Sequence, residues 1–376
     1  MKIVHFSDTH LGYQAFDVVN QRGINAREQD MYDAFVSVID RILQIRPDVV
    51  VHSGDFFHRP SPSNRALTLG LEQLRRLCDA KIPTVLIAGN HETPKTIYTS
   101  PILRALRSLD CVVPVFNEQY EVHEFGELAV HGIPHINDDR ILQQELARLA
   151  PLPNRWNLLL LHTSLGKTYL MEEYGEQIYP PEFIQSLEGF QYVALGHWHN
   201  FQQTTVAANA WYAGSTERMS ETEIGAEKGF VLLETLPNGK YDLQFEPIKT
   251  RPWLKLDLLQ CQHKIIAEIR EELLLFRASN PTNGAILSLN FLDIKAEQAL
   301  ELSNLHLRQV FPDSFQILPK RRIVAERNFA HRIEASQFDR LDAVFADYIR
   351  SRYPDDIALA DKLVEKARHY FHPFQS

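Results

Sequence analysis

The sequence predicts an α/β fold in which sheets are covered by helices, followed by a smaller α/β unit and C-terminal helices. Three observations carry this prediction. Five short apolar runs each end at once in Asp, Asn or His. Strand-like and helix-like patterns alternate up to about residue 245. A compact strand–helix–strand–helix–strand pattern follows, and such alternation is typical of sheets with helices packed on them.

The five apolar runs are interpreted as buried strands, because each is short and bounded by Gly or polar residues. They are KIVHFSDTH, DVVVHSGDFFH, PTVLIAGNHE, NLLLLHTS and QYVALGHWHN. The polar residues at their ends are Asp8, His10, Asp55, His58, Asn90, His91, His162, His197 and His199. Any one of these residues could be an ordinary core or turn residue. That explanation would have to apply at all five strand ends at once, which favours a functional cluster. Since ligand sites in open α/β folds gather at the carboxyl ends of strands, we expect one shared site.

Two amphipathic helices are expected between the first three strands. Residues 27–43 and 63–80 carry apolar side chains at helical spacing. The later segments LAVHGIPH, AWYAGST and KGFVLLETL are expected as further strands. The segment ETLPNGKYDLQFEPI is expected as a hairpin with its turn at Asn238 and Gly239.

A second unit begins after the segment PIKTRPWLKLDLL. We expect strands near Trp253–Leu259, Ala285–Phe291 and Phe315–Leu318, and helices near His263–Phe276 and Ala296–Val310. A third part begins at Ser336, which has capping-box spacing to Asp339, and ends in a helix that starts at Pro354. The chain therefore divides into residues 1–248, 249–330 and 331–376.

The composition is that of an ordinary soluble globular protein, with 44% hydrophobic and 23% charged residues among 376. No apolar run approaches the length of a membrane span and the chain starts with a strand pattern, so no membrane association is expected. The net charge of −9 argues against a large DNA-coating surface, because proteins that neutralise phosphates usually carry a basic face. The net charge neither supports nor opposes an enzyme that binds DNA close to bound metal ions.

The cysteines give no pattern. Cys78, Cys111 and Cys261 are few, odd in number and widely spaced. Neither a disulfide framework nor a cysteine-based zinc site is predicted from them. A reducing cytoplasm is the expected compartment.

The candidate ligands favour divalent metal ions. Asp8 and His10 lie two positions apart, so in an extended chain their side chains leave on one side. The same holds for His197 and His199. Asp55 offers a carboxylate whose two oxygens can bridge two cations. If Asp8 and Asp55 are the only charged ligands of two such ions, a net charge of about two remains, which suits an anionic phosphate ester.

His58 and His91 are not needed to complete two coordination spheres, although each lies beside a candidate ligand. A histidine that does not bind metal can donate a proton to a departing alkoxide. It can also donate a hydrogen bond to phosphoryl oxygens. We assign the acid role to His91 and the stabilising role to His58.

These motifs resemble the calcineurin-like metallophosphoesterase superfamily. DTHLG, GDFFHRPSPS, GNHE, LLLLHTSL and GHWH are similar to one branch of it, the SbcD-type double-strand-break repair nucleases, which include the meiotic recombination eleven proteins. AGST at Ala213–Thr216 and KGFVLLE at Lys228–Glu234 also resemble that branch. The resemblance in motifs covers the chain from Asp8 to about Glu234.

The resemblance implies a two-sheet β-sandwich flanked by helices for residues 1–248, a DNA-binding cap domain for residues 249–330 and a partner-docking segment for residues 331–376. It also implies two divalent metal ions, with Mn²⁺ expected. Asp8, His10, Asp55 and His199 would hold one ion, and Asp55, Asn90, His162 and His197 the other. His58 and His91 match the family's two catalytic histidines. Glu92 stands where the family usually has Asp, and we expect it to orient His91.

The implied reaction is phosphodiester hydrolysis in DNA, by a 3′–5′ exonuclease and single-strand endonuclease of a DNA repair complex. The implied partners are DNA and an SbcC-type ABC ATPase with a long coiled coil, and the implied assembly is a homodimer. The basic residues 320–322 are a candidate contact for a DNA backbone. Because the metal and phosphate motifs are shared, a phosphodiesterase or phosphatase acting on a nucleotide or phosphoprotein is the alternative. A catalytically idle scaffold is disfavoured, since every expected ligand and both histidines are present.

Overall fold

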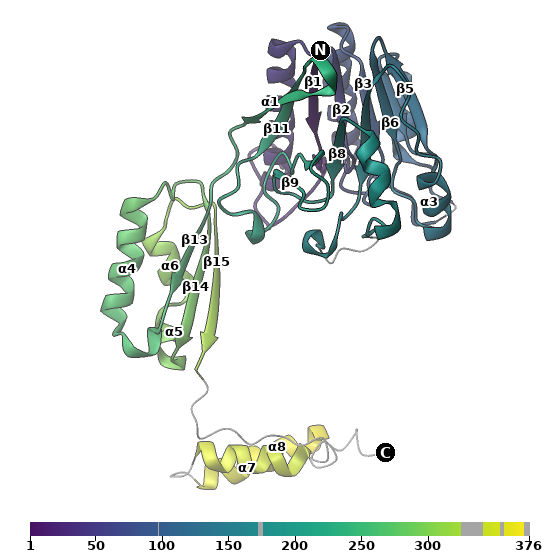
Figure 1. Cartoon of the computed structure of the whole chain (residues 1–376). Helices are drawn as coiled ribbons and strands as arrows, with labels where there is room; N and C mark the ends of the chain where they lie inside the picture. Colours follow the sequence, from purple (N-terminus) through teal and green to yellow (C-terminus); the bar gives the residue numbers. More distant parts are fainter. Residues whose placement is uncertain (97, 172–175, 325–340, 354–356, 372–376) are drawn as a thin grey trace.

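A computed structural model of the chain describes all residues except 97, 172–175, 325–340, 354–356 and 372–376 (Figure 1). In the described residues, the strands form two six-stranded sheets and one three-stranded sheet. The first sheet has the order β12-β11-β1-β2-β3-β4 and the second the order β5-β6-β7-β8-β10-β9. The two larger sheets form the sandwich expected for the first part of the chain.

The first sheet holds three of the five apolar runs. Its strands are β1 (Lys2–Phe6), β2 (Val49–His52), β3 (Thr84–Ile87), β4 (Val112–Val115), β11 (Gly229–Thr235) and β12 (Tyr241–Pro247). β1 to β4 run parallel, with α1 (Ala26–Ile45) and α2 (Asn64–Asp79) as the connections between β1, β2 and β3. β11 and β12 pair antiparallel, and the turn between them has positive φ at Asn238 and Gly239. The predicted hairpin is confirmed.

The second sheet holds the other two runs. Its strands are β5 (Glu121–Phe125), β6 (Leu128–Gly132), β7 (Trp156–His162), β8 (Tyr192–Gly196), β9 (Gln202–Gln203) and β10 (Ala210–Tyr212). β6, β7, β8 and β10 are parallel to their neighbours in that series. The helix α3 (Asp139–Leu146) and the 3-10 helix η3 (Pro181–Gly189) belong to the connections of this sheet. The other 3-10 helices are η1 (Ile102–Ser108), η2 (Lys167–Tyr169), η4 (Glu221–Glu223), η5 (Pro237–Gly239) and η6 (Cys261–His263).

The core lies in three layers that follow from the alternation of side chains along each strand. On β1, Ile3 packs in the cluster between the two sheets, which also contains Leu158 and Leu160 of β7. Val4, one position later, packs in the cluster that contains the helix residue Phe35. The outer face of the second sheet packs on α3 and η3 in a third cluster. The predicted fold, a two-sheet sandwich with helices on its outer faces, is therefore confirmed.

The third sheet consists of β13 (Trp253–Leu258), β14 (Ile286–Ile294) and β15 (Gln316–Ile323), all parallel. It packs on α4 (Ile266–Ser279), α5 (Ala296–Glu301) and α6 (Asn304–Val310) around a separate cluster. One continuous helix was expected where α5 and α6 lie. The helix breaks because Leu302 is buried in that cluster and Ser303 caps a new helix at the amide of His306.

An arginine ties this unit to the sandwich. Arg251, just before β13, donates to both carboxylate oxygens of Asp30 on α1, each at 2.6 Å. Its guanidinium also lies 4.0 Å from the ring centre of Phe315. These contacts come from residues on both sides of the expected boundary at residue 248, which itself stays a prediction. The expected boundary at residue 330 lies outside the described residues.

The helices α7 (Leu341–Arg352) and α8 (Ile357–Phe371) pack against each other. Their contact is made by Ala346 and Ile349 of α7 with Ala360 and Val364 of α8. The expected start of this part at Ser336 lies outside the described residues. Throughout the described part of the chain, every helix is too short or too polar to span a bilayer.

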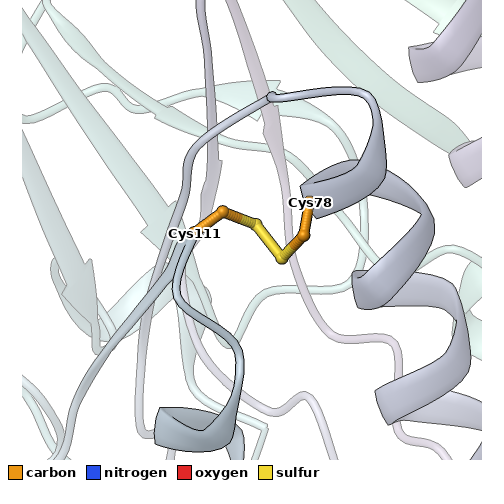
Figure 2. The surroundings of a disulfide bond; sticks show 2 residues. All are labelled: Cys78 and Cys111. Carbon is orange, nitrogen blue, oxygen red and sulfur yellow. A yellow bond between two sulfur atoms is a disulfide. The ribbon is translucent and has the colours of Figure 1, made fainter.

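The structure contains a disulfide that the cysteine spacing did not predict. Cys78 and Cys111 are bonded, with their Cα atoms 5.3 Å apart (Figure 2). Cys78 lies in the last turn of α2, which leads directly into β3, and the amide of Thr84 at the start of β3 donates to the carbonyl of Cys111. Parallel pairing of β3 with β4 thus brings together two residues that are 33 positions apart. Cysteine spacing consequently no longer supports a reducing compartment, because disulfides persist mainly in oxidising ones.

Candidate metal centre

The strand ends converge as the sequence predicts. Asp8 and His10 follow β1, Asp55 follows β2, Asn90 and His91 follow β3, His162 ends β7, and His197 and His199 follow β8. Backbone hydrogen bonds hold the first two loops together. The amide of Asp8 donates to the carbonyl of Gly54 at 3.0 Å, and the amide of His10 donates to the carbonyl of Asp55 at 3.0 Å. The two sheets of the sandwich thus supply one shared site.

The backbone at this site is unusual. Asp8, His10, Asp55 and His197 have φ of 51°, 42°, 55° and 95°. Residues other than Gly rarely occupy this left-handed region, and such strain concentrates at functional sites. The sharp turns aim the side chains past the sheet edges toward one another.

Two glycines allow the loops to approach closely. A Cβ atom added at Gly89 would lie 2.1 Å from Oδ1 of Asp55. One added at Gly196 would lie 2.1 Å from the carbonyl oxygen of Ser53 and 2.8 Å from Nδ1 of His162. All three distances are well inside van der Waals contact. Gly in the G-N-H and G-H-x-H motifs is therefore required by packing around Asp55 and His162.

Two groups of ligand atoms share Asp8. In one group, Asp8, His10 and His199 each offer an atom within 4.8 Å of the others, and the Nε2 atoms of the two histidines are 3.3 Å apart. In the second, Asp8, Asp55 and His162 meet the same limit. Two ligand atoms about 2.1 Å from one ion and at right angles to each other lie roughly 3 Å apart. The 3.3 Å between the two Nε2 atoms of the first group and the 3.2 Å between Oδ2 of Asp55 and Nε2 of His162 in the second are close to that value.

Asp55 belongs to the second group and also lies near His10 of the first. Its Oδ2 atom is 3.2 Å from Nε2 of His162 and 3.6 Å from Nε2 of His10. Its Oδ1 atom accepts a hydrogen bond from the amide of His91 at 3.0 Å. Oδ1 is thus used to fix the loop after β3, while Oδ2 faces ligand nitrogens from both sheets. This is the arrangement expected of a carboxylate that bridges two cations.

His162 is oriented by the backbone. Its Nδ1 donates to the carbonyl of Ser53 at 2.9 Å, which places the proton of the neutral ring on Nδ1 and makes Nε2 the nitrogen that can bind a cation. Nε2 lies 3.0 Å from Oδ1 of Asn90. A backbone partner of this kind is common for histidines that bind metal through the other nitrogen.

His197 lies differently from the other candidate ligands. Its ring centre is 5.6 Å from that of His162, and its amide donates to Oδ1 of Asp8 at 3.1 Å. Its Nε2 donates to the carboxylate of Glu176 at 2.8 Å. Glu176 also accepts from Ser164 and from the amide of Met171. The nitrogen of His197 that remains to bind a cation is therefore Nδ1.

His58 and His91 lie on the accessible side of the cluster. Their rings stack with centres 4.9 Å apart, and the side chain of His91 is 21% exposed. Nδ1 of His91 donates to the carbonyl of His58 at 3.0 Å, which leaves Nε2 3.9 Å from Oδ2 of Asp55. Nδ1 of His58 lies 3.3 Å from Nδ1 of His10. Both histidines can thus reach a molecule bound over the cluster.

The electrostatics of the site fit divalent cations. Burial lowers the pKa of His10 well below its usual range, so its imidazole is neutral and able to bind metal. Burial alone would raise the pKa of Asp55, but the imidazoles of His162 and His91 hold it well below its usual range. Burial raises the pKa of Asp8. A cation beside such a buried carboxyl favours its ionised form, so the donor set is chemically suited to metal.

Residues 1–201 match the sequence profile of calcineurin-like phosphoesterases. The chain belongs to the calcineurin-like phosphoesterase family. This match covers more than half of the 376 residues and includes every candidate ligand. Members of this metallophosphoesterase family use divalent metals, in agreement with the resemblance found in the motifs.

Within the calcineurin-like phosphoesterases, the chain is similar to proteins named DNA double-strand break repair protein Mre11. It is 30% identical to the one from Sulfolobus acidocaldarius over 69% of this chain and 66% of that protein. It is 33% identical to the one from Sulfurisphaera tokodaii over 60% of this chain and 57% of that protein. The matches thus span less than two thirds of these two relatives. A longer match, 27% identical over 79% of both chains, is to the one from Thermoplasma acidophilum.

Three carboxylates next to the candidate ligands, Glu92, Glu176 and Glu223, were not correctly predicted from the sequence. Glu92 was expected to orient His91, but it accepts from the amides of Phe57 and Gly89, both at 2.9 Å. It therefore ties the loop after β2 to the loop after β3. Glu176 and Glu223 were not expected at all, because neither follows a predicted strand. A carboxylate within reach of a ligand histidine is visible only once the chain is folded.

Proposed function

We propose that this chain is a two-metal DNA nuclease, a 3′–5′ exonuclease and single-strand endonuclease acting in DNA repair. The observation that carries the proposal is the position of Asp55, whose Oδ2 faces His162 on one side and His10 on the other. Two-metal sites of this kind occur in phosphatases and nucleases. The similarity to proteins named for double-strand break repair supports DNA as the substrate.

The proposed ligands divide into two sets around Asp55. Asp8, His10, Asp55 and His199 would hold one ion, and Asp55, Asn90, His162 and His197 the other, with Mn²⁺ as the expected metal. Divalent ions bound there would polarise the phosphate and provide an activated water. His162, with its proton on Nδ1, would bind through Nε2. His197, held by Glu176, would bind through Nδ1.

The two histidines on the open side would act on the substrate. His91, fixed through Nδ1 by the carbonyl of His58, would donate a proton from Nε2 to the departing 3′ or 5′ oxygen. His58, stacked on His91, would donate a hydrogen bond to a phosphoryl oxygen. Their partial exposure supports these roles, since substrate must reach them without displacing a buried ligand.

The basic run on β15 gives little support to the proposed DNA contact. Lys320 pairs with Glu221, Arg322 pairs with Asp293 at 3.0 Å, and Arg321 donates to the carbonyl of Leu302 at 2.6 Å. Each cation already has a partner within the chain. We therefore propose that the positive charge of the metal centre is the main attraction for the DNA backbone. An SbcC-type ABC ATPase with a coiled coil and a second copy of this chain remain proposed partners.

The test is a substrate panel with purified protein and Mn²⁺. The panel holds end-labelled single-stranded and duplex DNA, a cyclic dinucleotide, a phosphopeptide and bis(nitrophenyl) phosphate. The proposal expects shortening of duplex DNA from its 3′ ends and internal cuts in single strands, both absent in the His91→Asn variant. Turnover of the dinucleotide or the phosphopeptide with DNA left intact would instead establish the alternative phosphodiesterase or phosphatase. Two bound metals with no turnover of any substrate would identify a scaffold.

A further inference from the structure

His199 is held at both ring nitrogens. Its Nε2 lies 3.3 Å from Nε2 of His10, inside the group of ligand atoms that includes Asp8. Its Nδ1 lies 3.2 Å from Oε1 of Glu223. A carboxylate can only accept, so Nδ1 carries a proton, and in the neutral ring Nε2 is then the nitrogen whose lone pair faces the site.

Glu223 is itself held in place by several donors. Its Oε1 accepts from the amides of Met219 at 3.1 Å and Ser220 at 3.0 Å. Its Oε2 accepts from the hydroxyl of Ser215 at 2.9 Å and from the ammonium of Lys228. The carboxylate therefore has a single orientation, with Oε1 toward His199.

Lys228 also forms a hydrogen bond to the backbone of His199. Its ammonium donates to the carbonyl of His199 at 2.6 Å and to the hydroxyl of Ser215 at 2.9 Å. The amide of Ser215 donates to the same carbonyl at 3.0 Å. Gly214, with φ of +79°, makes this approach possible, because a Cβ atom there would lie 2.8 Å from that carbonyl oxygen.

The pair of Lys228 and Glu223 is fully buried, with 0% and 1% of the side chains exposed. Removing two charges from water is unfavourable, and a buried ion pair is weak evidence for stability. Stabilising the fold is thus a poor explanation for the pairing of Lys228 with Glu223. Glu223 also caps the start of η4, but both members of the pair contact His199, Glu223 at Nδ1 of the ring and Lys228 at the carbonyl oxygen. The segments AGST and KGFVLLE supply Ser215 and Lys228 to it.

We propose that Glu223 is a positioning residue that fixes the tautomer and direction of His199, with Lys228 and Ser215 holding its carboxylate. The inference rests on the proposed role of His199 as a metal ligand. Partners of metal-binding histidines typically contribute 10–100-fold to metal affinity. Glu223 should therefore govern the affinity of the ion bound by Asp8, His10, Asp55 and His199, and should leave the other ion unchanged.

The test is calorimetric titration of the chelator-treated protein with MnCl₂, in the absence of substrate. Glu223→Gln should weaken one of two binding events by about 10–100-fold, because an amide cannot accept from both Nδ1 of His199 and Lys228. Glu221→Gln, in the same 3-10 helix η4, is the matched control, and both binding events should stay within twofold of the unchanged chain. Unaltered binding in Glu223→Gln would overturn the positioning role.

A double-mutant cycle separates positioning from a general structural effect. His199→Ala should weaken the same binding event, and adding Glu223→Gln to it should cause no further loss, since Glu223 acts through the missing ring. A further tenfold loss in the double variant would mean that Glu223 acts by another route, and the proposal would fail. If His199→Ala alone leaves both events unchanged, the metal assignment fails and the positioning role with it.

A milder variant keeps the proposal testable if Glu223→Gln does not fold. Ser215→Ala removes one donor to the carboxylate and leaves the ion pair with Lys228 in place. It should weaken the same binding event by a smaller factor, with the other event unchanged. Equal weakening of both events, or of neither, would contradict the proposal.

Discussion

Oδ2 of Asp55 lies 3.2 Å from Nε2 of His162, although the two residues come from different sheets of the sandwich. The same oxygen lies 3.6 Å from Nε2 of His10. One carboxylate oxygen therefore lies close to a ligand nitrogen from each sheet. This relationship makes Asp55 the residue whose loss should affect the whole metal centre.

We expect Asp55→Ala to lose both metal ions and all DNA cleavage. The substitution removes the ligand that both ions share. It also removes one of the negative charges that offset the positive charge of the two ions in a buried site. Metal analysis of the purified variant, alongside circular dichroism to verify folding, measures this directly. Retention of two ions per chain would show that Asp55 does not bridge them.

His91→Asn should keep both ions and lose most turnover. His91 is the proposed proton donor, and general acid catalysis contributes on the order of 10²–10⁴-fold. The loss should shrink for bis(nitrophenyl) phosphate, whose leaving group needs no proton. The measurement is kcat on DNA and on this ester, with metal content determined in parallel. An equal loss on both substrates would argue against the acid role.

Glu92 should give the metal-free protein a distinct pH dependence. Burial, followed by the charge of Asp55, raises the pKa of Glu92 to about 8. Because its pKa in the unfolded chain is lower, about 4.3, the folded chain holds this proton in the range between, and stability falls as pH rises through that range. The slope is up to about 1.4 kcal/mol per pH unit.

Glu92→Gln cannot ionise and should remove this slope. One amide hydrogen would face the backbone amide of Phe57 or Gly89, so at pH 5 the variant should be less stable by about 1–3 kcal/mol. The difference in the free energy of unfolding between Glu92→Gln and the unchanged chain should become smaller toward pH 8. Urea unfolding of chelator-treated protein at pH 5, 6.5 and 8 provides the comparison. Parallel pH curves for the two proteins would contradict the assignment.

Removal of residues 333–376 should leave a folded nuclease. The helices α7 and α8 bury Ala346, Ile349, Ala360 and Val364 against each other, while Tyr348 and Ile357 are 48% and 70% exposed. We expect the truncated protein to keep two metals and to cut short single strands. ATP-stimulated cleavage of duplex DNA with the proposed ATPase should be lost. An insoluble or metal-free product would place these helices in the catalytic core.

The sequence correctly predicted that side chains meet where candidate ligand residues directly follow an apolar strand pattern. Asp8, Asp55 and Asn90 could be predicted as neighbours because the parallel strands of one sheet end at one edge. His162 ends a strand of the second sheet and was grouped with them only because that run also ends in a ligand residue; the structure brings all four side chains together. On β1, Ile3 packs between the sheets and Val4 toward the helices, which agrees with the buried strand that the short apolar run predicted. The pattern along the chain thus predicted sheets covered by helices and one shared site, while the two-sheet sandwich itself was implied by the family resemblance.

Features that depend on loops could not be predicted in this way. Glu176 and Glu223 reach His197 and His199 from segments without periodicity, so no spacing rule connects them. The break between α5 and α6 arises because Leu302 is buried in the core of the third sheet, which outweighs helix propensity there. Pairing of the cysteines required the register of β3 with β4.

The Cys78–Cys111 bond closes a covalent loop that contains all of β3 and the residues Asn90, His91 and Glu92. A cross-link across 33 residues restricts the unfolded chain by about 3–4 kcal/mol in the chain-entropy description. Thiol reductants such as dithiothreitol would remove this restriction. The oxidised and reduced chains are therefore two covalent species. Measurements of how the loop that carries His91 refolds are comparable with one another only when they are made at the same redox state of the buffer.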